Sequence, residues 1–322
     1  MNHFIDTGCI NPWRNLALEE LLFERTGGGT CLYLWQNQNT VVIGRNQNAW
    51  KECRIEALEA AGGRLARRSS GGGAVFHDMG NLNFTFITPR AAYDLRRQLG
   101  VIIQAVRSLG IAADFTGRND IVTDSGAKFS GNAFRYSQET GMHHGTILVD
   151  VDMSKLSAYL MPSKAKLAAK GVESVRSRVC NLAECVPGLT VAAVRQAVMA
   201  AFEKEYGAYT TLQETDLDQN ILEKKQEKYS SWEWRMGSSP TFDLELETRF
   251  AWGGITLQLA LSQGRILDAH VYSDAMDEAF ILGIPAALRN VRFAPEELAA
   301  AASELGGAEG ADLADWLRQV QI

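Results

Sequence analysis

The sequence is poor in cysteine and in long apolar runs, and each shortage excludes a class of protein. Its five cysteines are scattered over 322 residues without a Cys-x-x-Cys pair, so neither a zinc site nor a disulfide scaffold is predicted. No stretch is apolar for the roughly 18 residues that a membrane span needs, and charged residues interrupt the N-terminal segment as they would not in a signal peptide. We therefore expect a cytoplasmic protein with reduced thiols.

An excess of basic residues is also missing. Lys and Arg number 32 against 38 Asp and Glu, which gives a net charge of −6. Nucleic acids and anionic membranes are bound through clustered positive charge, so neither is an expected partner. The hydrophobic share of 46% is that of an ordinary globular protein of one large or two smaller domains, and a small molecule or a protein is the expected partner.

Helix and strand signals alternate irregularly along the chain, which predicts an α+β fold. Helices are expected after the capping pair Asn11-Pro12, over residues 50–61, 94–109, 152–160 and 190–206, and in the alanine-rich tail 295–321, where residues 306–310 look flexible. Strands are expected at residues 30–35, 40–43, 120–123, 128–134 and 144–149, and at residues 82–86, where alternation indicates one buried face. A turn-rich break at residues 232–240 precedes an expected hairpin of residues 249–261 and 265–272. We place domains at residues 1–240 and 241–322.

Residues 67–78 read Arg-Arg-Ser-Ser-Gly-Gly-Gly-Ala-Val-Phe-His-Asp and directly precede an apolar strand. Glycine lets backbone N–H groups approach an anion, and arginine binds phosphate or carboxylate through paired hydrogen bonds. The segment is not a P-loop, because neither Gly-Lys-Ser/Thr nor Gly-x-Gly-x-x-Gly is present. From composition alone, a flexible surface turn is as good an interpretation as a phosphate site.

Two other segments carry candidate groups. Lys128 begins an expected strand, where a lone lysine is usually a solvated surface charge. His143 and His144 are adjacent in the next expected strand, so they point to opposite faces and could not easily share one metal ion. One of them could line a pocket, although a hydrogen-bonded core histidine is the commoner outcome.

Together these segments resemble the lipoate–protein ligase A family, which is related to biotin protein ligases. The family pattern Arg-Arg-x-Ser-Gly-Gly-Gly-Ala-Val-Phe/Tyr-His-Asp-x-Gly-Asn stands at residues 67–81, and Lys-x-Ser-Gly-x-Ala stands at residues 128–133. Further matches lie at residues 34–35 with 40–45, 117–120, 143–146 and 169–178, and residues 249–255 are similar to the family's accessory domain. The resemblance implies a mixed-sheet catalytic domain of the biotin/lipoate ligase type, like class II synthetases, with a smaller α+β C-terminal domain.

The resemblance implies ATP-dependent joining of lipoate to a protein lysine. ATP would convert the carboxylate to lipoyl-AMP and pyrophosphate, and the lysine would then attack the acyl carbon and release AMP. The implied acceptors are lipoyl domains of 2-oxoacid dehydrogenase acyltransferase subunits and the glycine-cleavage carrier protein. Mg²⁺ is expected with ATP, because the pyrophosphate leaving group carries charge that needs neutralising.

The resemblance also assigns roles to residues of this sequence. The implied ATP contacts are Arg68, Ser70, Gly73, Ala74, Val75, Phe76, Asp120 and Lys128. The implied lipoate contacts are Trp35, Arg68, His77 and Lys128, although Trp35 could equally be a core residue. We expect Lys128 to be an electrostatic catalyst between the α-phosphate and the lipoyl carbonyl oxygen. Asp120 is the candidate metal ligand, with a turn or capping aspartate as the alternative, and residues 164–178 resemble the loop that covers the adenylate, including Lys170, Gly171, Arg176 and Arg178.

Other functions stay open at this point. The same fold supports acyl transfer from a carrier protein through a cysteine thioester without ATP, and Cys180 is the cysteine that could serve; the ordinary interpretation of such a residue is a buried, inert thiol. A non-catalytic lipoate or octanoate carrier and a biotin-specific ligase are further alternatives. The intact Arg68, Lys128 and glycines favour the lipoate ligase.

Overall fold

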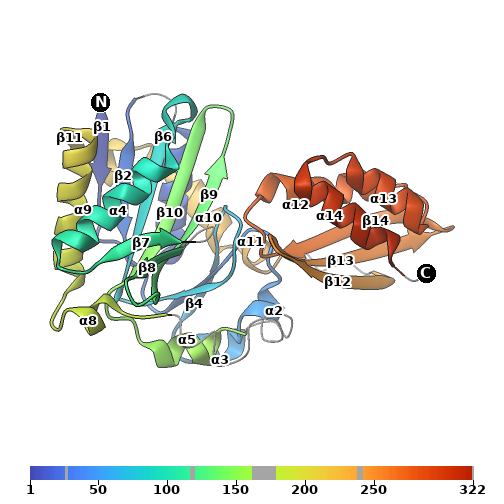
Figure 1. The fold of residues 1–322 in the computed structure, drawn as a ribbon, viewed down its shortest axis with the longest axis horizontal. Helices are drawn as coiled ribbons and strands as arrows, with labels where there is room; N and C mark the ends of the chain where they lie inside the picture. The colour runs from blue at the N-terminus through green and yellow to red at the C-terminus, as the bar shows by residue number, and fades with distance from the viewer. Residues whose placement is uncertain (26–27, 117–119, 162–178, 238–241, 321–322) are drawn as a thin grey trace.

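The computed structural model describes residues 1–25, 28–116, 120–161, 179–237 and 242–320. It shows a large N-terminal part and a small C-terminal part lying at one end of it (Figure 1). Both parts mix helices with β-sheet, which confirms the predicted α+β class. No helix within the described ranges is long and apolar enough to cross a membrane.

A large mixed sheet forms the centre of the N-terminal part, with strand order β11-β1-β2-β6-β10-β9-β8-β7. Strand β1 pairs in parallel with β2 and β11, and the pairs from β2 to β7 are antiparallel. The strands are β1 Asn2–Ile5, β2 Cys31–Trp35, β6 Asn81–Pro89, β7 Ala113–Thr116, β8 Asp120–Thr123, β9 Lys128–Tyr136, β10 Thr140–Leu148 and β11 Tyr209–Leu212. Strand β6 is buried on both faces, so the prediction of one buried face was wrong.

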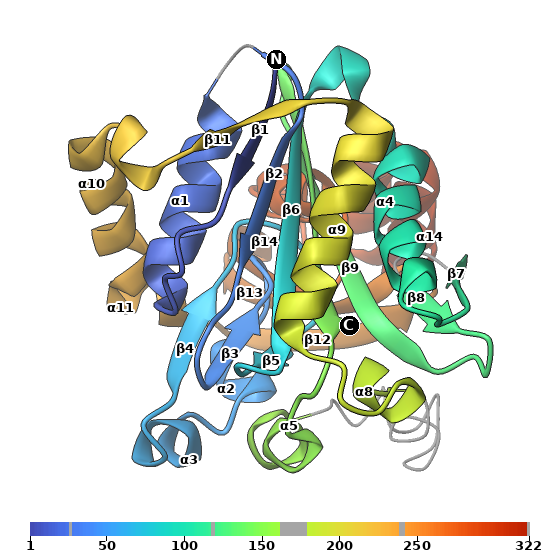
Figure 2. The same ribbon diagram turned by 90° about the vertical axis from the view of Figure 1, so that its left-hand side faces the viewer.

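Layers on both sides of the sheet explain that burial. Helices α4 (Leu95–Ser108) and α9 (Val191–Tyr206) lie side by side on one face, where they pack on residues such as Leu34 and Phe84 (Figure 2). On the other face lie α1 (Pro12–Glu24) and α10 (Gln219–Ser230), which share a second hydrophobic cluster with Tyr33 and Trp35. A small sheet of order β4-β3-β5 completes this side, with strands β3 Thr40–Ile43, β4 Arg64–Arg67 and β5 Val75–His77.

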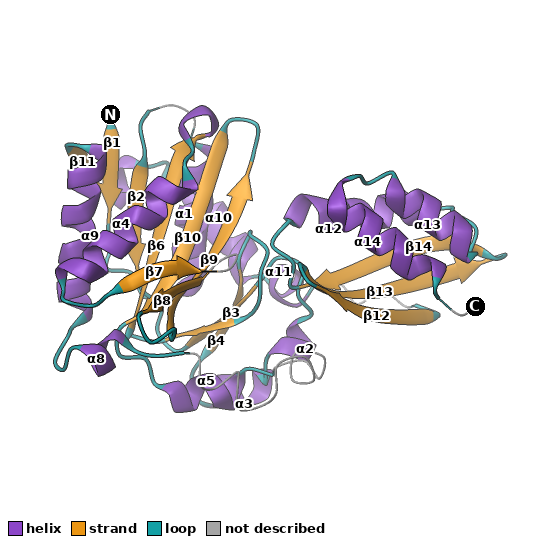
Figure 3. Cartoon of the chain, viewed as in Figure 1, coloured by secondary structure: helices purple, strands orange, loops and turns teal. Residues whose placement is uncertain are grey.

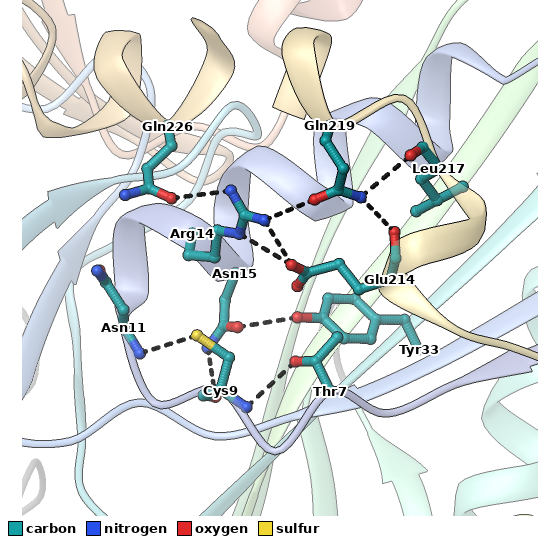
Figure 4. A network of polar contacts seen from close by, with 10 residues as sticks. All are labelled: Thr7, Cys9, Asn11, Arg14, Asn15, Tyr33, Glu214, Leu217, Gln219 and Gln226. Atoms are coloured by element: carbon teal, nitrogen blue, oxygen red, sulfur yellow. Dashed lines mark hydrogen bonds and ion pairs between the residues drawn. The ribbon is translucent and has the colours of Figure 1, made fainter. Parts of the chain in front are cut away.

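Helix α1 is fixed by a polar network that Figure 4 shows. The Asn11 side chain accepts from the backbone N–H of Trp13 and caps the helix, as predicted. Arg14 donates to Glu214 and to Gln219 and Gln226 of α10, while Asn15 accepts from the Tyr33 hydroxyl at 3.0 Å (Figure 4). The helix therefore keeps a fixed position against the sheet.

Two predictions for the N-terminal part, one of a helix and one of a turn-rich break, need correction. Residues 50–61 form not one helix but α2 (Ala49–Glu52) and α3 (Ile55–Ala60), because Cys53 leaves the helical path to form a β-bridge with Leu160. Residues 232–236 of the predicted turn-rich break form helix α11 (Trp232–Met236), capped by Ser231. The remaining short elements are α5 Met153–Tyr159, α8 Leu182–Cys185 and the 3-10 turns η1 Arg90–Ala92 and η2 Glu214–Asp216.

The C-terminal part is an antiparallel sheet of order β12-β13-β14 with three helices on one face (Figure 3). Its elements are β12 Leu244–Phe250, β13 Gly253–Ser262, β14 Arg265–Ser273, α12 Glu278–Leu288, α13 Pro295–Ser303 and α14 Gly307–Arg318. The predicted turn at Gln263-Gly264 is present, with both residues at positive φ. Residues 249–261 are not one strand, because a turn at Ala251-Trp252 separates β12 from β13.

The prediction that residues 306–310 are flexible was wrong. It begins helix α14, and the buried Gly310 lets this helix approach α13 closely: an added Cβ would lie 3.2 Å from the Ala302 carbonyl oxygen. The predicted domain boundary at residue 240 falls within residues 238–241, outside the described residues, and stays a prediction.

The two parts meet at the glycine-rich segment. The Gly72 N–H donates to the Ala275 carbonyl at 2.9 Å, and the Ser273 N–H donates to the Asn46 carbonyl at 2.6 Å. Lys51 forms an ion pair with Glu245 at 2.9 Å. Contact with the C-terminal part therefore involves the same segment that the sequence singles out for function.

Candidate functional site

A cavity of about 150 Å³ lies between the large sheet and the small sheet. Its lining residues come from distant segments: Leu16, Trp35, Val42, Arg68, Gly72, Gly73, Ala74, Val75, His77, Asn83, Lys128, Gly131, Asn132, Ala133, His144, Gly145 and Thr146. The glycine-rich segment thus forms one wall, and strands of the large sheet form the floor. Most of the wall is apolar, with a few polar groups, as in typical small-molecule sites.

The register of the large sheet fixes the floor. Trp35 on β2 is the direct partner of Asn83 on β6, and Asn83 is the partner of Thr146 on β10. Directly paired residues point to the same face of a sheet, so these three side chains form one row. The Thr146 hydroxyl then accepts from the Gly131 N–H on β9 at 3.2 Å. The row therefore runs from Trp35 toward the strand that carries Lys128.

Lys128 lies at the β9 side of the cavity. Its Nζ forms an ion pair with Asp120 Oδ1 at 2.6 Å, and both side chains are about one-third exposed. An added Cβ at Gly131 would lie 3.0 Å from the lysine Nζ, so the glycine leaves space for the lysine side chain. Lys128 is thus an available cation rather than a fully solvated surface group.

Arg68 holds the glycine-rich segment from inside. Its guanidinium donates to the carbonyls of Gly71 at 2.7 Å, Gly73 at 2.8 Å and Val42 at 3.3 Å. Burial lowers the pKa of Arg68 to about 10, which leaves the group charged at neutral pH. Arg68 therefore sets the path of the segment, with Gly72 in the left-handed region at φ +90°.

Four residues connect this segment to Trp35 through hydrogen bonds. The Trp35 Nε1–H donates to Thr85, and the Thr85 hydroxyl donates to Glu19 at 2.7 Å. His144 Nδ1 lies 2.7 Å from the same Glu19 oxygen, and His144 Nε2 lies 2.6 Å from Ser70 Oγ. The carboxylate accepts the Nδ1–H, and the Nε2 atom shares a hydrogen bond with the serine hydroxyl. Because Ser70 is fully buried, its hydroxyl group helps to position the glycine-rich segment and is not exposed as a nucleophile.

The two adjacent histidines do point to opposite faces. His143 contacts Gln98 of α4 and Asn132 among the aromatic residues of the other face, whereas His144 lines the cavity. Within the described residues, no group of three or more His, Cys, Asp or Glu could hold a metal ion.

The structure brings together most of the residues that the sequence singled out. Trp35, Arg68, Gly73, Ala74, Val75, His77 and Lys128 line the cavity. Ser70 is one hydrogen bond away through His144, and Asp120 contacts Lys128. The Phe76 side chain does not line the cavity, because it points to the opposite face of β5 and packs against Tyr159. Lys170, Gly171, Arg176 and Arg178 of the predicted adenylate loop lie outside the described residues.

Sequence reasoning missed Asn83, which lines the cavity, and Glu19, a buried acid in contact with the lining residue His144. Glu19 looks like an ordinary helix-surface acid, and Asn83 looks like the polar side of an alternating strand, yet they are only 1% and 2% exposed. A usable signal was the buried apolar pattern around both residues, since an acid or amide amid apolar neighbours requires a partner.

Cys180 lies next to Lys128 in space, because the Cys180 backbone N–H donates to the Lys128 carbonyl at 2.9 Å. The side chain is 8% exposed, and burial, with the nearby Cys185 and Glu184, raises the pKa of the thiol to about 11. Such a thiol is almost entirely protonated at neutral pH and is a poor nucleophile.

Comparisons with known proteins define the class of this chain. A family model described as the lipoyl protein ligase A/B catalytic domain matches residues 11–203, and one described as the bacterial lipoate protein ligase C-terminus matches residues 239–317. The fold is that of lipoate protein ligases, with the C-terminal domain that the second family model describes. The chain belongs to the lipoyl protein ligase A/B family, whose members are enzymes of protein lipoylation.

Solved structures agree with this assignment. Plasmodium falciparum LipL1 in complex with lipoate is 26% identical with a TM-score of 0.88, covering 99% of this chain and 100% of that one. A bipartite lipoate protein ligase from Thermoplasma acidophilum, studied with its E2 lipoyl domain, is 27% identical with a TM-score of 0.66 over 76% of this chain and 99% of that one. A lipoate-protein ligase A bound with ATP is 25% identical with a TM-score of 0.62 over 73% of this chain and 98% of that one.

Proposed function

We propose that this protein activates lipoate with ATP to lipoyl-AMP and transfers the lipoyl group to a lysine of a lipoyl domain. The observation that carries the proposal is the position of Lys128, a cation at one end of a mostly apolar cavity whose wall is the glycine-rich segment. A cavity of this kind suits an acyl chain with its carboxylate next to phosphate. The ATP-bound and lipoate-bound relatives support both substrates.

Each residue around the cavity has a role that follows from its position. Leu16, Val42 and Val75 offer apolar surface to the alkyl chain. Lys128 would stabilise the charge that develops on the lipoyl carbonyl oxygen and the α-phosphate, and a donor of this kind typically contributes about 3–4 kcal/mol. Arg68 keeps the segment from Gly71 to Gly73 in place, so that this segment forms a fixed wall beside the nucleotide. These contributions serve adenylate formation, and shielding of the adenylate from water serves the transfer step.

Asp120 is the residue that would hold Mg²⁺ with the phosphates of ATP. A single carboxylate is compatible with this ion, which usually takes one or two protein carboxylates, phosphate oxygens and water, and Asp120 is a partly exposed carboxylate beside Lys128. When bound, the ion would neutralise charge on the pyrophosphate leaving group.

Lipoyl domains are the proposed acceptors, as in the archaeal relative that was studied with its E2 lipoyl domain. The lipoyl domains of 2-oxoacid dehydrogenases and the glycine-cleavage carrier protein are the candidates. Their lysine amine would attack the acyl carbon of lipoyl-AMP, an amide would form, and AMP would leave.

Acyl transfer through a Cys180 thioester is the second candidate, because Cys180 is adjacent to the Lys128 backbone. The raised pKa of its thiol weighs against that route. A carrier without turnover would retain the cavity and release no pyrophosphate.

One reconstitution separates these functions. The protein is mixed with ATP, Mg²⁺, lipoate and an apo lipoyl domain, and the acceptor is weighed by mass spectrometry. We expect the mass of one lipoyl group to be added, only with ATP, by wild type and equally by Cys180→Ala. Modification from a lipoylated or octanoylated donor domain without ATP, abolished in Cys180→Ala, would establish the transferase instead.

A further inference from the structure

We propose that His77 selects lipoate by its ring sulfurs, with the His77 Nε2–H as a hydrogen-bond donor to the dithiolane. This inference rests on the proposed function only in taking the cavity to hold a lipoyl group. It adds a basis for distinguishing lipoate from fatty acids of the same length, which the apolar wall alone does not provide.

A chain of buried amides fixes which nitrogen of His77 carries the proton. Asn15 Nδ2 lies within hydrogen-bond distance of the backbone carbonyls of Cys9 and Gln36, which only the amide nitrogen could face, and its two hydrogens are shared among the neighbouring oxygens. It also lies 2.9 Å from Asn37 Oδ1, which therefore accepts. The other group of that amide, Asn37 Nδ2, must then donate to His77 Nδ1, 3.1 Å away. With Nδ1 as the acceptor, the proton of the neutral ring stands on Nε2.

His77 is neutral at physiological pH. Burial, with the positive charge of Arg68 and the nearby His144, lowers the pKa of its imidazole to about 3. The ring is 3% exposed. A neutral, buried donor is poorly suited to bind a carboxylate and well suited to a weak, polarisable, uncharged acceptor such as sulfur.

The His77 Nε2 atom has no hydrogen-bond partner among the described residues, and neither has Asn83 Nδ2. Both side chains line the cavity. A buried polar group left without a partner costs about 1–3 kcal/mol, so two of them lining one cavity point to a ligand that pairs with them. The indole N–H of Trp35 does not compete, because it donates to Thr85.

The position of His77 matches the far end of an acyl chain whose carboxylate lies at Lys128. His77 packs edge-on against Trp35, with ring centroids 6.2 Å apart. Trp35 stands on β2, and Lys128 stands on β9, three strands away in the sheet. Three spacings of about 4.8 Å separate these strands by about 14 Å, which is room for a chain of several carbons ending in a ring.

The test compares lipoate with cyclopentylpentanoate, which has the same ring and chain with carbon in place of both sulfurs. The dissociation constants of both acids are measured by calorimetry, and kcat/KM for adenylate formation is measured by pyrophosphate release. The variants are His77→Phe, which keeps a ring and removes the donor, and His143→Phe, the same change at a histidine outside the cavity. The ratio of the values for the two acids, measured on one protein preparation, does not depend on the fraction of the protein that is folded.

We expect wild type to prefer lipoate, His77→Phe to reduce that preference about three- to tenfold, the effect of one ordinary hydrogen bond, and His143→Phe to leave it unchanged. The ¹H and ¹⁵N resonances of the His77 Nε2–H group should move with lipoate and stay with the carbon analogue. An unchanged preference in His77→Phe, or an equal loss with both acids, would overturn the inference. If wild type binds both acids and forms no adenylate, the proposed function fails, and the binding ratio still decides the role of His77.

Discussion

At the level of single residues, Lys128 is expected to contribute to catalysis and little to stability. Its side chain is about one-third exposed and its ion pair with Asp120 is partly solvated, so its removal should cost the fold little. For Lys128→Ala we expect adenylate formation to fall about 100- to 1000-fold, the usual loss for one preorganised donor, with an unchanged circular dichroism spectrum.

Pyrophosphate release under saturating ATP and lipoate measures that loss. Lys155→Ala is the matched control, because this lysine is exposed, pairs with Asp152 at 3.9 Å and lies outside the cavity. Near-normal release by Lys128→Ala would remove the lysine from the mechanism.

His77 should also make stability depend on pH. The pKa of this imidazole is about 3 in the folded protein and 6.5 in an ordinary setting, so the unfolded chain binds a proton that the folded chain rejects. The stabilisation is complete above pH 6.5 and is lost as the pH falls toward 3, at about 1.4 kcal/mol per pH unit. From pH 7 to pH 5, His77 should therefore cost about 2 kcal/mol, a loss that urea unfolding of His77→Phe should lack. Parallel curves for variant and wild type would show that the folded protein takes up this proton.

At the level of elements, helix α4 contains a glycine, Gly100, at a position where neither the backbone conformation nor the packing requires glycine. An added Cβ at Gly100 meets no atom within 4 Å, and its backbone is helical. Gly100→Ala should stabilise the protein by about 0.5–1 kcal/mol, since alanine loses less backbone freedom in a helix. The midpoint of urea unfolding measures this change.

Gly110 is the matched counterpart, because it follows the same helix at φ +85°. Gly110→Ala should destabilise by about 1 kcal/mol, as left-handed backbone is costly for alanine. Two shifts of the same sign would contradict the assigned end of α4.

At the scale of the whole molecule, the glycine-rich segment is shared between the cavity and the C-terminal part. An added Cβ at Gly71 would lie 2.4 Å from the Ala275 carbonyl oxygen and 2.9 Å from that of Met276. Both are backbone atoms, so Gly71→Ala should push the C-terminal segment away and break the bond from the Gly72 N–H to the Ala275 carbonyl. We expect amide exchange at Gly72 to accelerate about five- to tenfold, the effect of losing about 1 kcal/mol.

Hydrogen-exchange mass spectrometry of residues 68–78 and 270–278 measures this effect. Gly100→Ala is the steric control, because its new methyl group meets no neighbour. Unchanged protection of both segments in Gly71→Ala would mean that the contact adjusts without separating.

The elements whose signals are local could be predicted from the sequence alone. Capping by Asn11, Asp94, Asp152 and Thr190 marks the starts of helices α1, α4, α5 and α9, since each cap acts on a backbone N–H within three residues. The motifs at residues 67–81 and 128–133 likewise indicate the family from the sequence, and both reach the cavity.

The contacts between residues far apart in the sequence, in contrast, follow from the three-dimensional fold. Glu19 contacts His144 across 125 positions of sequence, and Asn37 fixes the proton of His77 across 40. The β-bridge of Cys53 to Leu160 likewise breaks a helix that its own spacing predicts. Sheet register and the packing of layers decide which polar groups are buried. A buried polar group needs a hydrogen-bond partner, and that partner can come from any part of the chain. The glycine-rich segment was visible in the sequence, whereas the buried groups that position it were not.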